Sequence, residues 1–239
     1  MRNGRRSGWR ILLGGLVACL LAFGSGASAT SVDAPRPAAA ENALTDGASN
    51  IAARFAGLPQ KGNRIGDPRA PITIVYYGDI ACPACALAQR VVVPKLIKTF
   101  VRTGRVKMVF RAIAFIGPTS ERGALGAEAA ARQDALWPFV SLLLANQGPE
   151  NREWLKEEGM LAAATTLGLD PARWQADYDG KPVARAFVRA GRQAKADRVA
   201  STPWFVIRGP RGKRNVVGVR GLPAFRAAIA RVGPRSQGY

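Results

Sequence analysis

The chain has 239 residues, of which 48% are hydrophobic and 21% are charged, and its formal net charge is +19. This length gives room for one domain with a sizeable core, and the spread of charged and aromatic residues argues against extended disorder. The chain has no histidine. That absence excludes Ser-His-Asp and Cys-His catalysis, zinc sites with imidazole ligands and histidine general bases.

The N-terminus has the pattern of an export signal. Four arginines within the first ten residues precede an apolar run at 11–23, and Ala27-Ser28-Ala29 supplies small residues before a cleavage site. The run is shorter than the roughly 20 residues of a membrane-spanning helix. We therefore predict a signal peptide at 1–29 and a periplasmic or extracytoplasmic location. Two alternatives stay open: lipidation at Cys19, which ends a lipobox-like Leu-Val-Ala-Cys, and an uncleaved membrane anchor.

The net charge needs its own interpretation. Without the four arginines of the signal it falls from +19 to +15, which is compatible with binding to nucleic acid, an anionic membrane surface or acidic clients. The basic residues are dispersed along the sequence and are not interleaved with aromatic residues. We interpret the charge as a solvated, arginine-rich surface and expect no nucleic-acid partner.

The first half of the chain predicts a spacer followed by a strand, a helix and a strand. Residues 30–63 are rich in Ala and Pro and predict a flexible spacer that ends in a short helix around 48–55. The β-branched and aromatic run at 72–77 predicts a buried central strand. A helix is expected over 83–104, because proline suits a first helical turn and glycine a helix end, with a kink at Pro94. The alternation at 106–113 predicts a second strand.

The remaining elements complete the expected fold. Strand, helix and strand in succession imply a right-handed βαβ unit with parallel strands. A segment at about 119–199, rich in Ala, Leu and Arg, predicts three or four helices. Residues 204–207 and 215–219 predict an antiparallel hairpin, and 222–232 a closing helix. The order βαβ…ββα around an all-helical insertion predicts an α/β thioredoxin fold, with the folded domain at 64–235.

Two of the three cysteines stand close together in Cys82-Pro83-Ala84-Cys85. A disulfide between them closes almost no loop, which favours redox chemistry over a structural role. At a helix N-terminus the unpaired N–H groups and the helix dipole favour thiolate, so Cys82 is the predicted nucleophile and Cys85, one turn later, the resolving thiol. A structural zinc needs about four ligands, which the chain does not supply, so we expect no metal and no cofactor.

These motifs resemble the DsbA-like thiol–disulfide oxidoreductases of bacterial cell envelopes, over residues 66–232. The similarity lies in the entry to the first core strand, the Cys-Pro-Ala-Cys motif, the stretches 94–111 and 144–147, and Ser201-Thr202-Pro203-Trp204. The resemblance implies that the bond before Pro203 is cis. It also implies that the loop of Thr202 and Pro203 faces the cysteines and binds an extended client, with Thr202 tuning the pair's reactivity.

The sequence departs from this family in three places. Members often carry an acid six residues before the first cysteine, where this chain has Tyr76, so Asp79 is the nearest acid. Strongly oxidising members place histidine between the cysteines, whereas Pro83 and Ala84 stand here, which predicts a less oxidising pair. Trp204 is bulky for a residue beside the client groove, and either a client contact or core packing would explain it.

The resemblance implies a thiol–disulfide oxidoreductase, and we favour a monomeric, disulfide-donating oxidase. Its partners would be exported cysteine-containing clients and a DsbB-like membrane protein that reoxidises it. One alternative is an extracytoplasmic reductase or isomerase, kept reduced by a membrane electron donor. Another is a chaperone-like binding module of thioredoxin fold, against which the retention of both cysteines argues.

Overall fold

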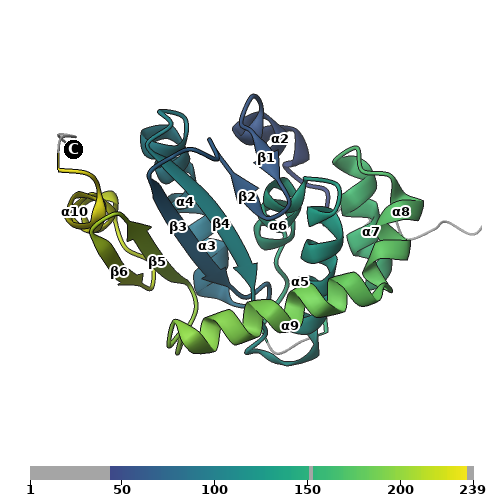
Figure 1. The fold of residues 1–239 in the computed structure, drawn as a ribbon. Coiled ribbons are helices and arrows are strands. Elements are labelled where there is room, and N and C mark those ends of the chain that lie inside the picture. The colour runs from purple at the N-terminus through teal and green to yellow at the C-terminus, as the bar shows by residue number, and fades with distance from the viewer. Residues whose placement is uncertain (1–43, 151–152, 236–239) are drawn as a thin grey trace, which may run out of the picture. The chain divides into compact units, whose positions relative to one another are not determined.

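The structure is a computed structural model that describes residues 44–150 and 153–235. The signal peptide predicted at 1–29, with Cys19, lies outside the described residues. In chain order the elements are α2 (Ala48–Phe55), β1 (Gln60–Lys61), β2 (Arg64–Ile65), β3 (Ile72–Gly78), α3 (Pro83–Val91), α4 (Val93–Leu96), the π-helix η1 (Ile97–Val101), β4 (Val106–Ala112), α5 (Gly117–Ala131), α6 (Leu136–Ala145), α7 (Glu157–Thr166), α8 (Pro171–Tyr178), α9 (Lys181–Ala196), β5 (Trp204–Gly209), β6 (Gly212–Val217) and α10 (Leu222–Val232) (Figure 1).

A six-stranded sheet in the order β1-β2-β4-β3-β5-β6 forms the centre of the fold. β3 and β4 are parallel, and α3, α4 and η1 connect them; β5 is antiparallel to β3, and β6 to β5. Helices α5 to α9 are inserted between β4 and β5, and α10 follows the hairpin. This arrangement confirms the predicted thioredoxin fold with an all-helical insertion.

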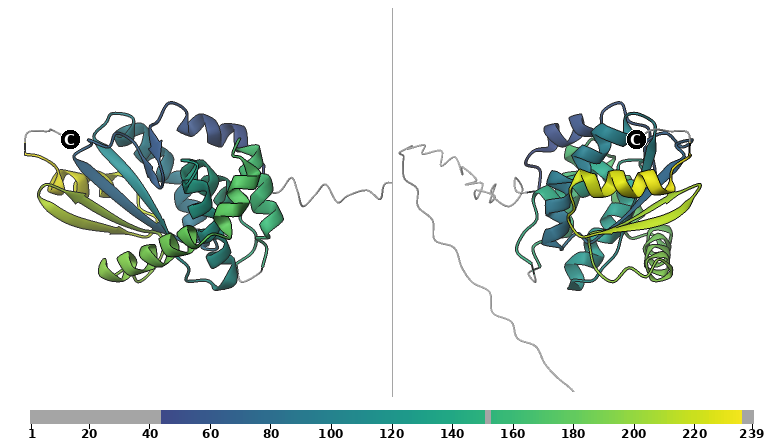
Figure 2. Two further views of the ribbon diagram at one scale, coloured as in Figure 1. Left: turned by 45° about the vertical axis from the view of Figure 1, so that its right-hand side comes forward. Right: turned by 90° about the vertical axis from the view of Figure 1, so that its left-hand side faces the viewer.

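The central strand β3 is buried on both faces, as its continuous apolar sequence predicts. Ile74 and Tyr76 point into the larger core, which includes α3 and α6, while Val75 and Tyr77 belong to a smaller cluster with Ala194 of α9. Helices α3 and α4 lie on one face of the sheet, and α9 crosses the other face near the carboxyl ends of β3 and β4 (Figures 1 and 2). The helix that carries the two cysteines and helix α9 are thus on opposite sides.

The described fold begins before residue 64, which corrects the part of the predicted spacer at 30–63 that follows residue 43; residues 30–43 lie outside the described residues. Ile51 and Phe55 of α2 are buried, and the Phe55 ring lies 6.4 Å from that of Trp137 in α6. β2 pairs with β4, opposite Met108 at Ile65. The i, i+4 spacing of Ile51 and Phe55 gives the short helix one apolar face, which is buried against the domain.

The predicted helix over 83–104 is broken into three segments. α3 ends at Val91, α4 starts at Val93, and the π-helix η1 completes the connection to residue 101. Pro94 explains the break, because it lacks an N–H and its ring would clash with the carbonyl four residues earlier in a continuous helix.

The hairpin is present, but the bounds of both strands differ from the predicted ones. β5 continues to Gly209, and β6 runs over Gly212–Val217 instead of 215–219. Gly209 pairs with Gly212, so the turn between the strands consists of the two residues 210 and 211. A side chain at 209 would meet the carbonyl oxygen of Val232 at 2.4 Å, so this position requires glycine.

Candidate active site

The two thiols lie at the start of α3. Cys82 is the N-cap residue in extended backbone conformation, Pro83 occupies the first turn, and Cys85 follows within it. Both cysteines are free thiols, and their exposed fractions are 7% for Cys82 and 0% for Cys85. The helix N-terminus thus presents the first sulfur at the surface edge and keeps the second in the core.

The surroundings of Cys82 favour its thiolate. Hydrogen bonding from the Cys85 thiol has the largest effect, and interactions with Thr202 and the backbone N–H groups of Cys85 and Ala84 add to it. Burial acts in the opposite direction, but the net effect lowers the pKa of Cys82 to about 6. At neutral pH most of the Cys82 thiol is therefore ionised, which is the state that attacks disulfides and leaves from them.

Cys85 has the opposite character. Burial raises the pKa of the Cys85 thiol well above its usual value, and the neighbouring Cys82 sulfur raises it further. The backbone N–H of Asp79 points at the Cys85 sulfur at 3.4 Å. The pair therefore consists of one ionised, slightly exposed sulfur and one protonated, fully buried sulfur.

The loop before β5 lies against Cys82. The Thr202–Pro203 peptide bond is cis, as the family resemblance implies, and the Cys82 sulfur lies 3.5 Å from the Thr202 carbonyl oxygen, to which the protonated thiol donates. Trp204 pairs with Tyr77 and packs against the smaller cluster, on the sheet face away from the thiols. Of the two roles considered for Trp204, this position supports core packing.

Asp79, the acid nearest to the pair in sequence, accepts hydrogen bonds from the backbone. Its carboxylate is fully buried and accepts from the N–H groups of Ala81 at 2.8 Å, Phe115 at 2.7 Å and Ile116 at 3.2 Å. These bonds tie the turn that precedes Cys82 to the loop after β4. The geometry gives Asp79 a structural role in holding the cysteine turn.

Replacing Asp79 with alanine should destabilise the protein strongly. The N–H groups of Ala81 and Phe115 lose their acceptor, whereas that of Ile116 keeps the Ser120 hydroxyl at 3.2 Å. Each N–H group left without an acceptor costs about 1–3 kcal/mol, so we expect a loss of roughly 2 kcal/mol or more in the free energy of unfolding. Urea denaturation measures this loss. Asp67→Ala is the control, because the carboxylate of Asp67 also caps a backbone N–H, that of Arg69 at 2.8 Å, but does so at the surface; an equal loss in both variants would contradict the structural role.

Tyr76 occupies the position where family members often carry an acid. It is fully buried, stacked on Phe205 at 4.5 Å and edge-on to Phe110 at 4.9 Å between ring centroids. Its hydroxyl donates to the Cys85 carbonyl at 3.5 Å and also interacts with the Cys85 thiol. Burial, with a further contribution from Cys85, raises the pKa of Tyr76 well above its usual value, so the hydroxyl keeps its proton. The sequence marked this position as a departure from the family but did not predict the contact.

An open pocket adjoins the turn before Cys82. Its volume is about 400 Å³, and it is lined by Ala81, Phe115, Ile116, Gly117, Pro118, Thr119, Glu150 and Glu153. Phe115 is 53% exposed, which is unusual for a phenylalanine in a folded domain. Sequence reasoning missed this residue, because one aromatic side chain in a loop gives no periodic signal. Among residues 44–150 and 153–235, no cluster of three or more Cys, Asp or Glu could hold a metal ion.

The thioredoxin fold, with an ionised thiol and a buried thiol at the start of the helix after the central strand, defines a thiol–disulfide oxidoreductase. A family model described as thioredoxin matches residues 60–216, and the chain belongs to that family.

Disulfide bond formation proteins of Bacillus species resemble this chain. The chain is 28% identical over 149 residues to the probable disulfide bond formation protein D of Bacillus cereus, covering 61% of this chain and 69% of that protein. It is 34% identical over 106 residues to disulfide bond formation protein D of Bacillus subtilis, covering 43% of this chain and 48% of that protein. The oxidised crystal structure of BdbD from Bacillus subtilis superposes with a TM-score of 0.64 at 22% identity, over 73% of this chain and 96% of that one.

Proposed function

We propose that this oxidoreductase donates disulfides to exported proteins, with Cys82 and Cys85 as its catalytic residues. The observation that carries the proposal is the contrast between the two thiols, with the pKa of Cys82 lowered to about 6 and that of Cys85 raised by burial. A stabilised thiolate at Cys82 stabilises the reduced form of the pair, which makes its disulfide a better oxidant. The names of the Bacillus relatives, disulfide bond formation proteins, support the same direction.

The proposed reaction has two exchanges. A client thiolate attacks the Cys82 sulfur of the Cys82–Cys85 disulfide, the S–S bond breaks, and Cys85 leaves as a thiolate that takes up a proton. A second client thiolate then attacks the client sulfur of the mixed disulfide and displaces Cys82 as a thiolate. The client dithiol is oxidised to a disulfide, and the enzyme disulfide is reduced to Cys82 and Cys85.

In the first exchange the buried Cys85 thiolate needs a hydrogen-bond donor. The Tyr76 hydroxyl fills this need in the proposed mechanism, because it lies beside Cys85 and keeps its proton. A hydroxyl provides the donor without placing a charge between the rings of Phe110 and Phe205.

The client would bind beside Cys82. The Thr202–Pro203 loop lies at hydrogen-bond distance from the Cys82 sulfur, so a client cysteine joined to Cys82 would run along this loop. The exposed Phe115 and its pocket on the other side of Ala81 offer apolar contact to an unfolded client. Such contacts suit a broad range of clients, because they read no particular sequence.

Export and reoxidation complete the proposal. The signal at 1–29 would direct the protein out of the cytoplasm, where it would act as a monomer and be reoxidised by a DsbB-like membrane partner. Across the described residues, no helix combines the length and hydrophobicity of a membrane span.

The reduction potential of the pair tests the direction of exchange. Strong oxidants such as DsbA lie near −120 mV and thioredoxin near −270 mV. Equilibration with glutathione should give a value above about −170 mV for a disulfide donor. A value below about −230 mV would overturn the oxidase.

A reductase is the second candidate, and one observation favours it. The pKa of about 6 at Cys82 is closer to the value near 7 of thioredoxin than to that of about 3.5 in DsbA. Pro83 and Ala84 add no charge between the cysteines that would lower it further. The same measurement of the potential separates this candidate from the oxidase.

The alkylation rate of the reduced protein should follow the ionisation of Cys82. Only the thiolate reacts, so the rate should rise with pH around a midpoint near 6. In Cys85→Ala the midpoint should move up, because the largest stabilising hydrogen bond is lost. Iodoacetamide trapping across pH 4–10 measures both curves, and an unchanged midpoint in Cys85→Ala would show that the helix N-terminus and Thr202 set the pKa without the Cys85 thiol.

A further inference from the structure

Helix α9 exposes a row of five basic residues. Val183, Ala190 and Ala194 form its buried face, and the helix contains no acidic residue. The exposed basic residues follow each other at intervals of three or four, which places them along one side of the helix. This α9 basic stripe consists of Lys181, Arg185, Arg189, Arg192 and Lys195.

The stripe is not neutralised within the fold. None of its five side chains forms a hydrogen bond or salt bridge with another residue that the structure describes, although Arg189 has a longer-range interaction with Glu128. Other exposed arginines are paired: Arg132 and Arg173 lie beside Asp177, and Arg208 beside Asp197. The positive charge of the α9 basic stripe is therefore available to a partner.

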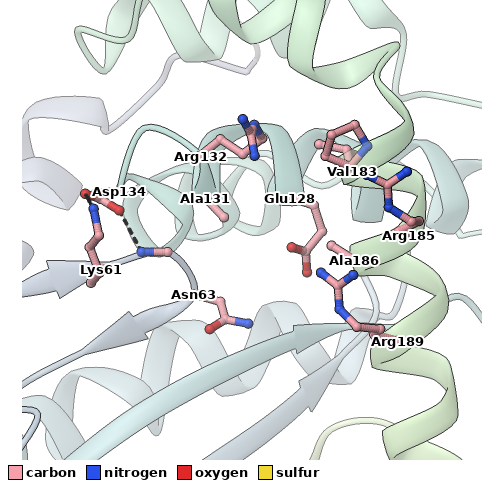
Figure 3. A pocket seen from close by; sticks show the side chains of 12 residues that line it. Lys61, Asn63, Glu128, Ala131, Arg132, Asp134, Val183, Arg185, Ala186 and Arg189 are labelled. Atoms are coloured by element: carbon pink, nitrogen blue, oxygen red, sulfur yellow. Dashed lines mark hydrogen bonds and ion pairs between the residues drawn. The ribbon is translucent and has the colours of Figure 1, made fainter.

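A pocket extends this surface beyond α9. It has a volume of about 550 Å³ and lies between α9, α5 and the turn of β1 and β2. Arg185 and Arg189 reach toward it from α9, and Glu128 faces them from α5 (Figure 3). Lys61 on the far side is paired with Asp134 at 3.0 Å. Two stripe arginines against the single Glu128 leave the near side of the pocket positive.

The shape of the stripe indicates its partner. The helix has 16 residues and is about 24 Å long at about 1.5 Å per residue, so its cations form a nearly straight line. The line stands on the helix face opposite the buried one, with Val188, 52% exposed, among the arginines; Arg185 and Arg189 border the pocket, whereas Lys181, Arg192 and Lys195 do not. A row of charge with one apolar side chain, most of it outside the pocket, fits a flat anionic surface better than it fits a peptide, which binds in a groove or along a sheet edge.

We propose that the α9 basic stripe adsorbs to an anionic phospholipid bilayer. Basic residues held at such a surface each contribute about 1 kcal/mol of attraction, and Val188 can reach the headgroup region. Helix α9 leads directly into residues 197–203, which end at the loop beside Cys82. Adsorption would hold the domain at the membrane surface, where exported chains emerge, with the cysteine helix on the side of the sheet away from α9. Such adsorption would serve an oxidase and a reductase alike.

Vesicle binding by the full chain tests the proposal. The wild type is compared with Arg185→Gln/Arg189→Gln/Arg192→Gln and with a control of equal charge change, Arg90→Gln/Lys95→Gln/Lys98→Gln, whose side chains are exposed on α3, α4 and η1 across the sheet. Each protein is sedimented with vesicles of phosphatidylcholine alone and with one third phosphatidylglycerol, at low and high salt. All three proteins share the same N-terminal segment, so a difference between them reports on α9.

The wild type should bind the phosphatidylglycerol vesicles in preference, and salt should release it. The stripe variant should lose about 100-fold in partitioning, because each basic residue contributes a factor of about five; the control should lose far less. Equal losses in both variants, or binding that ignores phosphatidylglycerol, would overturn the proposal. Binding to polyglutamate without binding to vesicles would also overturn it and would assign the stripe to an acidic protein. Unchanged exchange with dithiothreitol confirms that the variants are folded.

Discussion

Replacing Cys85 with serine should convert the enzyme into a trap for its clients, whereas replacing Cys82 should leave it inert. Cys82 carries the lowered pKa and the more exposed sulfur, so it is the sulfur that forms the mixed disulfide. With Cys85 gone, nothing within the enzyme can displace the bound client. Incubation of Cys85→Ser, activated as a mixed disulfide with a small thiol, with a reduced unfolded protein that has a single cysteine should give a covalent complex on a non-reducing gel, because no second client thiol can then displace Cys82.

The reciprocal variant is the matched control. In Cys82→Ser the remaining thiol at 85 is fully buried, and its pKa is raised by that burial. We expect no covalent complex and no turnover from this variant. A complex joined through Cys85, identified by mass spectrometry of the linked peptides, would reverse the roles assigned to the two thiols.

The order of the central elements follows from local sequence signals. The apolar run of β3 is buried on both faces, and Pro83 starts a helix where its missing N–H costs nothing. A strand, a helix and a second strand in succession favour a right-handed connection between parallel strands. The parallel pairing of β3 and β4 could therefore be expected from the sequence. The thioredoxin fold could therefore be predicted, together with the position of the thiols at its helix N-terminus.

The elements before β3 could not be predicted in the same way. β1 and β2 have two residues each, too few for any periodic pattern, and β2 is a strand because it pairs with β4. The composition of 30–63 suggested a spacer, yet Phe55 is held by Trp137, which lies far along the chain. Tertiary contacts decide the structure of such short segments.

Within the site, the sequence indicated the sulfurs but not their neighbours. The role of Asp79 depends on N–H groups at 115 and 116, brought to it by the loop after β4. The basic residues of α9 looked dispersed in the sequence, because an interval of three or four residues becomes a single row only on a helix. Tyr76 looked like the loss of an acid, and only the structure shows that its hydroxyl lies beside Cys85 and donates to the Cys85 carbonyl.

Replacing Tyr76 with phenylalanine should slow thiol exchange by about 10- to 100-fold, since a hydrogen bond to a charged group is worth about 1.5–3 kcal/mol. The ring keeps its contacts with Phe110 and Phe205, and only the hydroxyl beside Cys85 is lost. Without this donor the Cys85 thiolate is less stable, so the pKa of Cys85 should rise further. Stopped-flow reduction of the oxidised enzyme by a peptide thiol gives the rate, and ultraviolet titration of the thiolate in the reduced enzyme follows the pKa.

The neighbouring tyrosine provides a control in the same strand. Tyr77 donates to Asp197 at 2.7 Å on the opposite face of the sheet, so Tyr77→Phe removes a hydrogen-bonded hydroxyl of the same strand that has no contact with either thiol. This variant should lose about 1 kcal/mol of stability and keep the exchange rate and the thiol pKa of the wild type. If both variants slow exchange alike, the Tyr76 hydroxyl acts on the packing of β3 and not on the sulfur. If only Tyr76→Phe is slow, a neutral hydroxyl serves the buried thiol at the position where related proteins often place a carboxylate.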